Sequence, residues 1–145
     1  MKIIQTKISE LTYFKPNIFK DERGRFLESI NLEIKKFTGI KEFNQTAVSF
    51  SKFGVFRGLH YQVNSPLVQF VQCIKGKVID IACDLRESSQ TFGKTFMLEL
   101  NSETSNILFL PAGIAHGFLA LSDENILLYN INGEYNKNFE RGIHY

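Results

Sequence analysis

The sequence predicts an all-β fold, in the form of a sandwich, a jelly roll or a barrel, within one domain that spans residues 1–145. A chain of 145 residues has the usual size of one domain. Its 43% hydrophobic and 22% charged residues lie near the globular average, which excludes extensive disorder. Short apolar runs recur about every 8 to 12 residues, a spacing typical of all-β sandwiches and barrels.

The first elements that the pattern predicts are a helix and a strand. Residues 31–37 are the helix candidate, although Leu32, Ile34 and Phe37 are spaced poorly for one helical face. The apolar run over residues 67–74 predicts a strand. The dipeptide Lys75-Gly76 that follows it predicts a tight hairpin turn to the next strand.

The strand over residues 78–85 has the clearest period of two. One face is bulky and apolar and consists of Ile79, Ile81, Cys83 and Leu85. The other face is small and acidic and consists of Val78, Asp80, Ala82 and Asp84. Polar groups on an inward face suit a barrel that holds a ligand in its mouth. The same face could equally be exposed to solvent, and the alternation alone leaves both interpretations open.

Further strands are predicted over residues 94–100, 106–110 and 125–131. The segments Pro111-Ala112-Gly113 and Ser122-Asp123-Glu124 have the composition of turns and are expected to connect strands.

Charge and cysteine usage limit the class of partner and the compartment. Seventeen Lys+Arg against fifteen Asp+Glu give a net charge of +2, which argues against general binding of nucleic acid or acidic membranes. No apolar run is long enough to span a bilayer, and the first ten residues do not form a signal peptide. Cys73 and Cys83 lie in strand-like runs and are expected to be buried free thiols, which predicts a reducing, cytoplasmic location.

Three clusters carry groups that are used in acid–base chemistry. Imidazoles titrate near neutrality and phenols near about pH 10, so both suit proton transfer. The clusters are residues 57–62 with His60, residues 111–118 with His116, and the pair Tyr129 and Tyr135.

These clusters predict neither a metal nor an organic cofactor. Metal triads in small β-barrels usually need two nearby histidines, whereas the residue two positions after His60 is Gln62. The other histidines, His116 and His144, are isolated in the sequence, and neither cysteine lies in a ligand-spaced pair. No nucleophile elbow, phosphate loop or dinucleotide-binding motif is present.

Several longer stretches are distinctive: FKDERGRFLE at 19–28, GVFRGLHYQ at 54–62, GKVIDIACDLR at 76–86 and PAGIAHGF at 111–118. Residues 89–93 and 129–142 add to the same pattern. The chain thereby resembles the cupin-type isomerases of dTDP-linked sugars, above all the dTDP-4-dehydrorhamnose 3,5-epimerase family. The resemblance runs from about residue 10 to the end. It implies a cupin jelly-roll barrel.

The resemblance implies catalytic roles for three residues. His60 is similar to the general base that removes the proton beside the sugar ketone. Tyr129 is similar to the acid that returns a proton from the other face. Asp80 matches a pocket position beside them.

The resemblance also implies a set of substrate-binding residues. Arg57 is similar to a pyrophosphate contact, a role that suits a bidentate guanidinium. Phe19, Arg23 and Glu28 resemble the segment that holds the nucleotide, often across a dimer interface. A homodimer in which residues 1–28 reach the partner's pocket is therefore expected. The other substrate-binding residues that the resemblance implies are Gln45, Gln62, Gln69, His116 and Tyr135.

Three departures from the epimerase pattern bear on the reaction. Gln69 stands where the epimerases usually carry a lysine that steadies the enolate oxygen, and Ala47 where they carry an asparagine. The epimerases also continue beyond the last residue of this chain, in a tail whose aspartate partners the catalytic histidine. The related dTDP-sugar 3,4-ketoisomerases lack that tail and have a glutamine at the position of Gln69, but they normally have a second histidine where Gln62 stands.

The expected substrate is a dTDP-4-keto-6-deoxyhexose, in the biosynthesis of a deoxysugar for surface glycans such as lipopolysaccharide. Gln69 and the chain length favour 3,4-ketoisomerisation, because a neutral amide tolerates a neutral enediol better than an ammonium does. The alternative is 3,5-epimerisation, or epimerisation at C3 alone. An inactive module that only binds the sugar nucleotide is a third hypothesis. The presence together of His60, His116, Tyr129 and Tyr135 argues against it.

Overall fold

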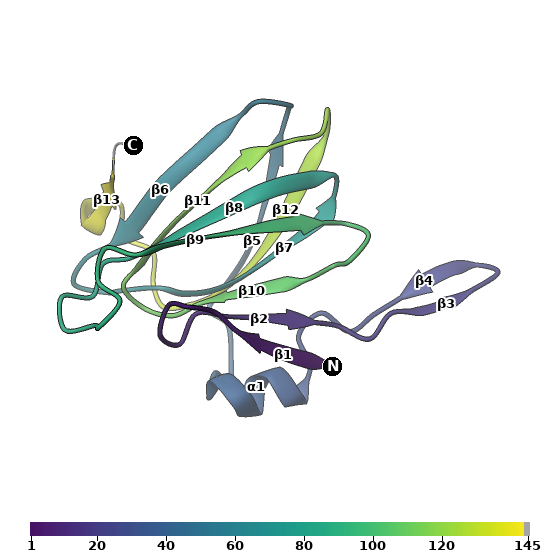
Figure 1. Cartoon of the computed structure of the whole chain (residues 1–145), viewed down its shortest axis with the longest axis horizontal. Helices are drawn as coiled ribbons and strands as arrows, with labels where there is room; N and C mark the ends of the chain where they lie inside the picture. Colours follow the sequence, from purple (N-terminus) through teal and green to yellow (C-terminus); the bar gives the residue numbers. More distant parts are fainter. Residues whose placement is uncertain (144–145) are drawn as a thin grey trace.

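The computed structural model describes residues 1–143, in which two antiparallel sheets face each other (Figure 1). The six-stranded sheet has the order β1 (Lys2–Gln5), β2 (Thr12–Lys15), β10 (Ile107–Leu110), β7 (Val68–Lys75), β12 (Asn125–Asn132) and β5 (Gln45–Ser51). The five-stranded sheet has the order β13 (Glu140–Gly142), β6 (Phe56–Gln62), β11 (Ile114–Ala120), β8 (Lys77–Asp84) and β9 (Thr95–Asn101). The predicted all-β architecture is confirmed, although the sheets do not close into a barrel.

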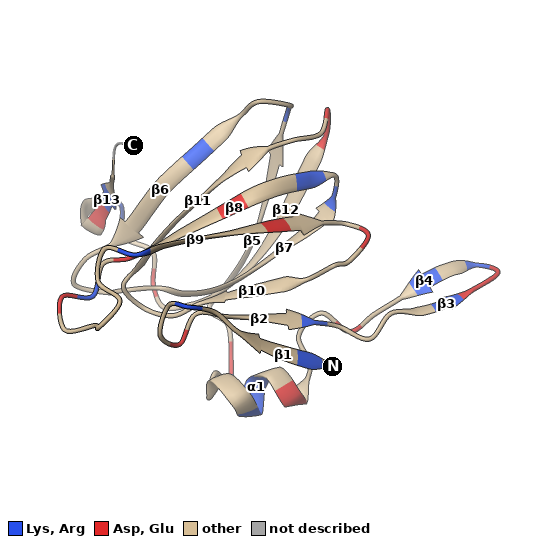
Figure 2. Cartoon of the chain, in the orientation of Figure 1, with Lys and Arg blue, Asp and Glu red and all other residues tan. Residues whose placement is uncertain are grey.

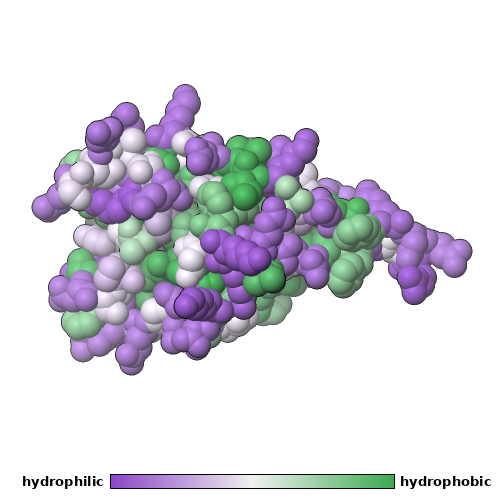
Figure 3. All heavy atoms as spheres, turned by 90° about the horizontal axis from the view of Figure 1, so that it is seen from below, coloured by the Kyte–Doolittle hydropathy of each residue, from purple (hydrophilic) through white to green (hydrophobic). Residues whose placement is uncertain are grey.

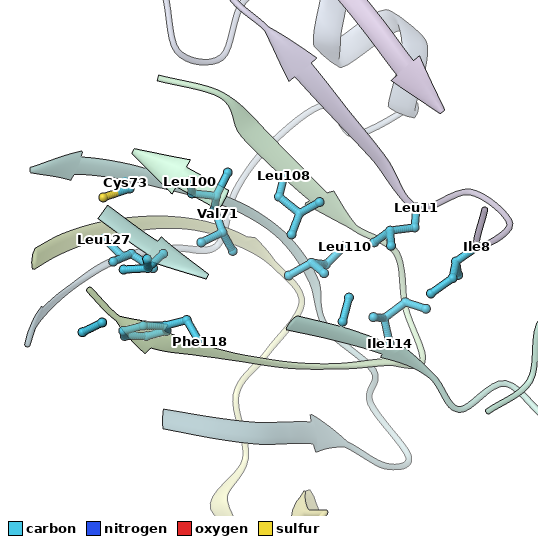
Figure 4. Packing of buried hydrophobic residues seen from close by; sticks show 13 residues of the cluster. Ile8, Leu11, Val71, Cys73, Leu100, Leu108, Leu110, Ile114, Phe118 and Leu127 are labelled. Atoms are coloured by element: carbon cyan, nitrogen blue, oxygen red, sulfur yellow. The ribbon is translucent and has the colours of Figure 1, made fainter. Parts of the chain in front are cut away.

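The space between the sheets holds the main hydrophobic core (Figure 4). Its buried members are Ile8, Leu11, Val71, Cys73, Val78, Ala82, Leu100, Leu108, Leu110, Ile114, Phe118, Ala120 and Leu127. The small acidic face of β8 points into this space, because Val78, Asp80, Ala82 and Asp84 are all at most 1% exposed. This face is therefore the interior of the sandwich, which settles the choice that the alternation left open.

The predicted hairpin at Lys75-Gly76 is wrong. β7 pairs with β10 and β12, whereas β8 pairs with β9 and β11, so the turn carries the chain from one sheet to the other. Gly76 has φ +79°, and a Cβ atom there would lie 2.2 Å from the carbonyl oxygen of Glu124. Asn125 fixes the turn by accepting a hydrogen bond from the Lys77 backbone N–H at 3.1 Å. A glycine between two apolar runs predicts a turn, but it does not show with which strands each run pairs.

The predicted helix is confirmed as α1 (Leu32–Thr38), which covers the outer face of the six-stranded sheet (Figure 1). The Asn31 side chain caps its first turn by accepting from the Ile34 N–H at 3.1 Å, and Gly39 ends it at φ +73°. Ile34 is the residue of the helix that is fully buried, in a second cluster with Phe14, Phe70, Ile107 and Phe109. One buried anchor suffices for so short a helix, which explains the poor apolar spacing.

The hairpin of β3 (Phe19–Asp21) and β4 (Gly24–Phe26) pairs with neither large sheet and projects away from the body (Figures 1 and 3). Phe19 and Phe26 are 62% and 66% exposed on it. Charged residues gather on this hairpin and in the loops, and single charged positions also lie within β6, β8 and β9 (Figure 2). A short 3-10 turn, Lys137–Phe139, precedes β13. Within the described residues, no helix is long and apolar enough to cross a membrane.

Candidate active site

A bulge in β6 turns Arg57 and His60 toward the same cavity. Residues three positions apart on a regular strand point to opposite faces of a sheet. His60 pairs with His116 and Arg57 pairs with Phe118, so three steps along β6 match two steps along β11. Gly58 lies in the bulge at φ +117°, and a Cβ atom there would clash with β11 at 2.5 Å. A glycine is therefore needed to place Arg57 beside His60.

The histidine on β11 is paired with a buried carboxylate on β8. His116 Nε2 lies 2.7 Å from Asp80 Oδ2, and the side chain of Asp80 is completely buried. This contact fixes the imidazole orientation and leaves Nδ1 for a ligand, since no described residue hydrogen-bonds that nitrogen. Asp80 Oδ1 is buried without a hydrogen-bond partner in the part of the chain that the structure describes.

Tyr129 approaches the same cavity from the opposite sheet. Its hydroxyl lies 3.1 Å from Ser49 Oγ on β5, and its ring stands edge-on to His116 with centroids 6.4 Å apart. Burial raises the pKa of Tyr129 to about 12, and the nearby Asp80 carboxylate acts in the same direction. The Ser49 hydrogen bond and the Arg57 cation oppose this shift. The phenol therefore keeps its proton at neutral pH and can serve as an acid.

Arg57 is held at one edge of its guanidinium. Its Nε donates to Ser51 Oγ at 3.1 Å, and its Nη2 donates to the Phe50 carbonyl at 3.2 Å. Nη1 donates no hydrogen bond to a described residue, and the side chain is exposed at the cavity rim. An oriented guanidinium with open donors suits a phosphate oxygen.

Two cavities meet at His60 and Gln69. The larger, of about 560 Å³, is lined by Phe56, Arg57, Gly58, His60, Gln69, His116, Gly117, Phe118 and Tyr129. The smaller, of about 170 Å³, is lined by His60, Tyr61, Gln62, Leu67, Gln69, Gly113, Ile114, Ile131, Tyr135 and Glu140. The imidazole of His60 and the amide of Gln69 have no hydrogen-bond partner among residues 1–143. Both are therefore open to a ligand in the cavities.

Gln62 and Tyr135 line the smaller cavity, but their polar groups already have protein partners. Gln62 donates to the carbonyls of Ser65 and Glu134 and accepts from the Asn136 N–H at 2.8 Å. The hydroxyl of Tyr135 donates to Glu140 at 2.8 Å. Gln62 thus holds the loop that carries Tyr135, which is a role that the sequence analysis did not foresee.

Other site residues expected from the sequence lie outside this constellation. Phe19, Arg23 and Glu28 are exposed on or next to the projecting hairpin, where Arg23 pairs with Asp21 at 2.6 Å. Gln45 starts β5, opposite Ile131 of β12, and is exposed. The structure of the single chain therefore does not bring these four residues to His60.

Sequence reasoning missed the small residues on β5 that hold the site. Ser49 and Ser51 contact Tyr129 and Arg57, respectively. Their signal is the alternation of the small residues Ala47, Ser49 and Ser51 with the larger, apolar Val48 and Phe50. It is visible only once β5 is known to be a strand.

The chemistry that this arrangement supports is proton transfer on two sides of a bound molecule. His60 comes from the five-stranded sheet and Tyr129 from the six-stranded sheet, and both line the larger cavity. A base on one side and an acid on the other can invert a carbon centre. Within residues 1–143, no three His, Cys, Asp or Glu side chains group closely enough to hold a metal ion. His144 lies outside the described residues.

A family model described as dTDP-4-dehydrorhamnose 3,5-epimerase matches residues 5–145. The chain is 46% identical to a dTDP-4-dehydrorhamnose 3,5-epimerase of Shigella flexneri, over 99% of this chain and 81% of the relative.

Solved structures give the same result. A 3,5-epimerase of Legionella pneumophila in complex with dTDP-4-keto-L-rhamnose superposes with a TM-score of 0.94 at 38% identity, over 99% of this chain and 78% of the other. A 3'-monoepimerase of Streptomyces bikiniensis in complex with dTDP-quinovose superposes with a TM-score of 0.90 at 28% identity, over 97% and 72%. The expected cupin jelly roll is confirmed by these neighbours.

Proposed function

The chain belongs to the dTDP-4-dehydrorhamnose 3,5-epimerase family, and we propose from this premise that it inverts C3 and C5 of a dTDP-4-keto-6-deoxyhexose. The observation that carries the proposal is the placement of His60 and Tyr129 on opposite sheets around one cavity. The 4-keto group makes the hydrogens on both neighbouring carbons acidic, so one base and one acid can serve both centres.

Each inversion has two proton transfers. His60 takes the proton from the carbon beside the ketone, and the electron pair moves to form an enolate with its charge on O4. Tyr129 then gives its proton to the opposite face of that carbon, and solvent later restores both groups. The amide N–H of Gln69, which lines both cavities, is a neutral donor for O4. Arg57 binds the diphosphate with its open donors.

The expected 3,4-ketoisomerisation is not supported by the relatives, since those described above are named as epimerases. Gln69 favoured that expectation because it replaces a cation with a neutral amide. An amide can nevertheless donate a hydrogen bond to an enolate, so its neutrality does not decide between the reactions. Retention of the acid–base pair also argues against an inactive binding module.

A homodimer completes the nucleotide site in this proposal. Phe19 and Phe26 are largely exposed on a hairpin that belongs to neither sheet. Such aromatic exposure suits a contact with a second copy. Phe19, Arg23 and Glu28 of one protomer would then hold the nucleotide whose sugar lies beside His60 of its partner.

Solvent exchange in heavy water tests the proposed function. The protein is incubated with dTDP-4-keto-6-deoxyglucose, and proton NMR follows the signals at C3 and C5. We expect deuterium to enter both positions with inversion. Tyr129→Phe should keep exchange while slowing inversion, because His60 can return deuterium to the original face. His60→Asn should slow both by about 10² to 10⁴. Absence of exchange with the wild-type protein would leave only a binding role.

A further inference from the structure

Two serines on the inner face of β5 hold two different functional side chains. Ser51 accepts from Arg57, and Ser49 lies 3.1 Å from the hydroxyl of Tyr129. In the β5–β12 ladder Ser49 is paired with Leu127, so it reaches Tyr129 diagonally across two antiparallel strands. Ser49 is half-buried and Tyr129 lines the larger cavity, which places the serine behind the phenol.

We propose that Ser49 is a positioning residue that aims the Tyr129 phenol and stabilises the phenolate left after proton transfer. The inference deepens the proposed function and rests on it. In the resting state either hydroxyl of the pair can be the donor. Once the proton of Tyr129 has moved to carbon, the phenolate oxygen can only accept. Ser49 must then donate, keeping its own proton, until solvent reprotonates Tyr129.

The surroundings of the phenol make this donor important. Burial opposes ionisation of the Tyr129 phenol most strongly. The negative charges of Asp80 on β8 and of Cys73 on β7, when these groups are ionised, oppose it as well. Arg57 on β6 and Ser49 on β5 favour it, while the His116 ring from β11 stands edge-on. The serine is the one neutral side chain among residues 1–143 that hydrogen-bonds the phenol oxygen.

The test replaces Ser49 and reads the ionisation of Tyr129 without relying on turnover. Biosynthetic incorporation of 3-fluorotyrosine lowers phenol pKa values, so fluorine NMR can follow the titration before alkaline unfolding. The Tyr129 resonance is assigned by its loss in Tyr129→Phe. Ser49→Ala should raise the apparent pKa of Tyr129 and lower kcat about tenfold with KM little changed. Ser49→Thr should restore both values toward wild type.

Thr46→Ala is the matched control. Thr46 also hydrogen-bonds across β5 and β12, to Asn130 at 3.1 Å, but on the exposed face. Its replacement should leave kcat and the Tyr129 titration unchanged. A folded Ser49→Ala protein with an unchanged pKa of Tyr129 and a kcat within twofold of wild type would overturn the inference. Failure of the wild-type protein to epimerise would instead defeat the proposed function, and the fluorine titration would still decide whether Ser49 stabilises the phenolate.

Discussion

His60 is the residue on which the proposed chemistry depends most. It lines both cavities, and its imidazole has no hydrogen-bond partner within residues 1–143. A core histidine with a structural role would be buried and hydrogen-bonded. His60 is instead exposed at the rim, next to Arg57, where a substrate can reach it.

His60→Asn should lower kcat by about 10² to 10⁴, the usual effect of losing a positioned base. The dissociation constant for dTDP should change little, because Arg57 is the residue proposed to bind the diphosphate. Steady-state kinetics and calorimetry measure the two effects. Nearly full turnover in the folded variant would remove His60 from the mechanism.

Gln69→Lys tests how O4 is stabilised. At an effective dielectric constant of 20, a unit charge about 4 Å from O4 is worth roughly 4 kcal/mol before desolvation costs. Even a small part of that should raise the rate of C3 deuterium exchange several-fold, whereas Gln69→Ala should lower it. A Gln69→Lys protein that folds but exchanges more slowly than wild type would show that Gln69 does not face O4.

At the scale of elements, the β8–β9 connection is fixed by a buried ion pair. Asp84 accepts from Arg86 Nε and Nη2 at 2.9 Å and from the hydroxyls of Ser89 and Thr91 at 2.7 Å. Arg86 also contacts Glu10 in the loop before β2. The Arg86 guanidinium holds the pKa of the Asp84 carboxyl well below its usual range. This network ties the amino-terminal loop to the five-stranded sheet.

Asp84→Asn should cost about 3 kcal/mol at pH 7, because it leaves Arg86 without its buried partner. A carboxyl with a lowered folded-state pKa adds stability above its unfolded pKa of about 3.9, and this contribution is lost as the pH falls toward the folded value. The difference between wild type and variant should therefore begin to shrink below about pH 4 and keep shrinking as the pH falls further. Urea unfolding of the two proteins over a range of pH measures the loss of stability and its pH dependence.

Asp21→Asn is the control for this prediction, because its ion pair with Arg23 is in solvent. It should leave the unfolding midpoint unchanged. A constant difference between wild type and Asp84→Asn from pH 7 down to pH 3 would contradict the assigned role.

The individual strands were predictable from the sequence, whereas their pairing was not. Strands with strict alternation, such as 78–85, could be placed because side-chain period is a local property. Pairing is not local, so the sequence pattern predicts the wrong strand partners for the turn at Gly76. The bulge at Gly58 depends on a contact with β11, so nothing local showed that Arg57 would face the side of His60. Asp80 and His116 came from resemblance, and their 2.7 Å contact needed the sheet register.

At the scale of the whole molecule, the residues proposed to hold the nucleotide, Phe19, Arg23 and Glu28, do not line the cavity of His60 and Tyr129 in a single chain. The β3–β4 hairpin projects from the body (Figures 1 and 3). The cavity with His60 is instead lined by residues of both large sheets. The proposed homodimer resolves this separation, because one protomer's hairpin can serve the partner's cavity.

Subunit complementation tests the dimer. Arg23→Ala and His60→Asn should each be nearly inactive alone. Mixed and allowed to exchange subunits, they should regain about a quarter of wild-type activity, since half the dimers are mixed and each has one intact site. Two Arg23→Ala preparations mixed together are the control. A monodisperse monomer by light scattering, or no recovery on mixing, would contradict the shared site.

The position of the ketone in the wild-type product tests the central claim most directly. Carbon NMR of the product formed from dTDP-4-keto-6-deoxyglucose in heavy water should show the ketone still at C4, with deuterium and inverted configuration at C3 and C5. A ketone at C3, with a new carbon-bound deuterium at C4, would contradict the epimerase account and establish ketoisomerisation instead.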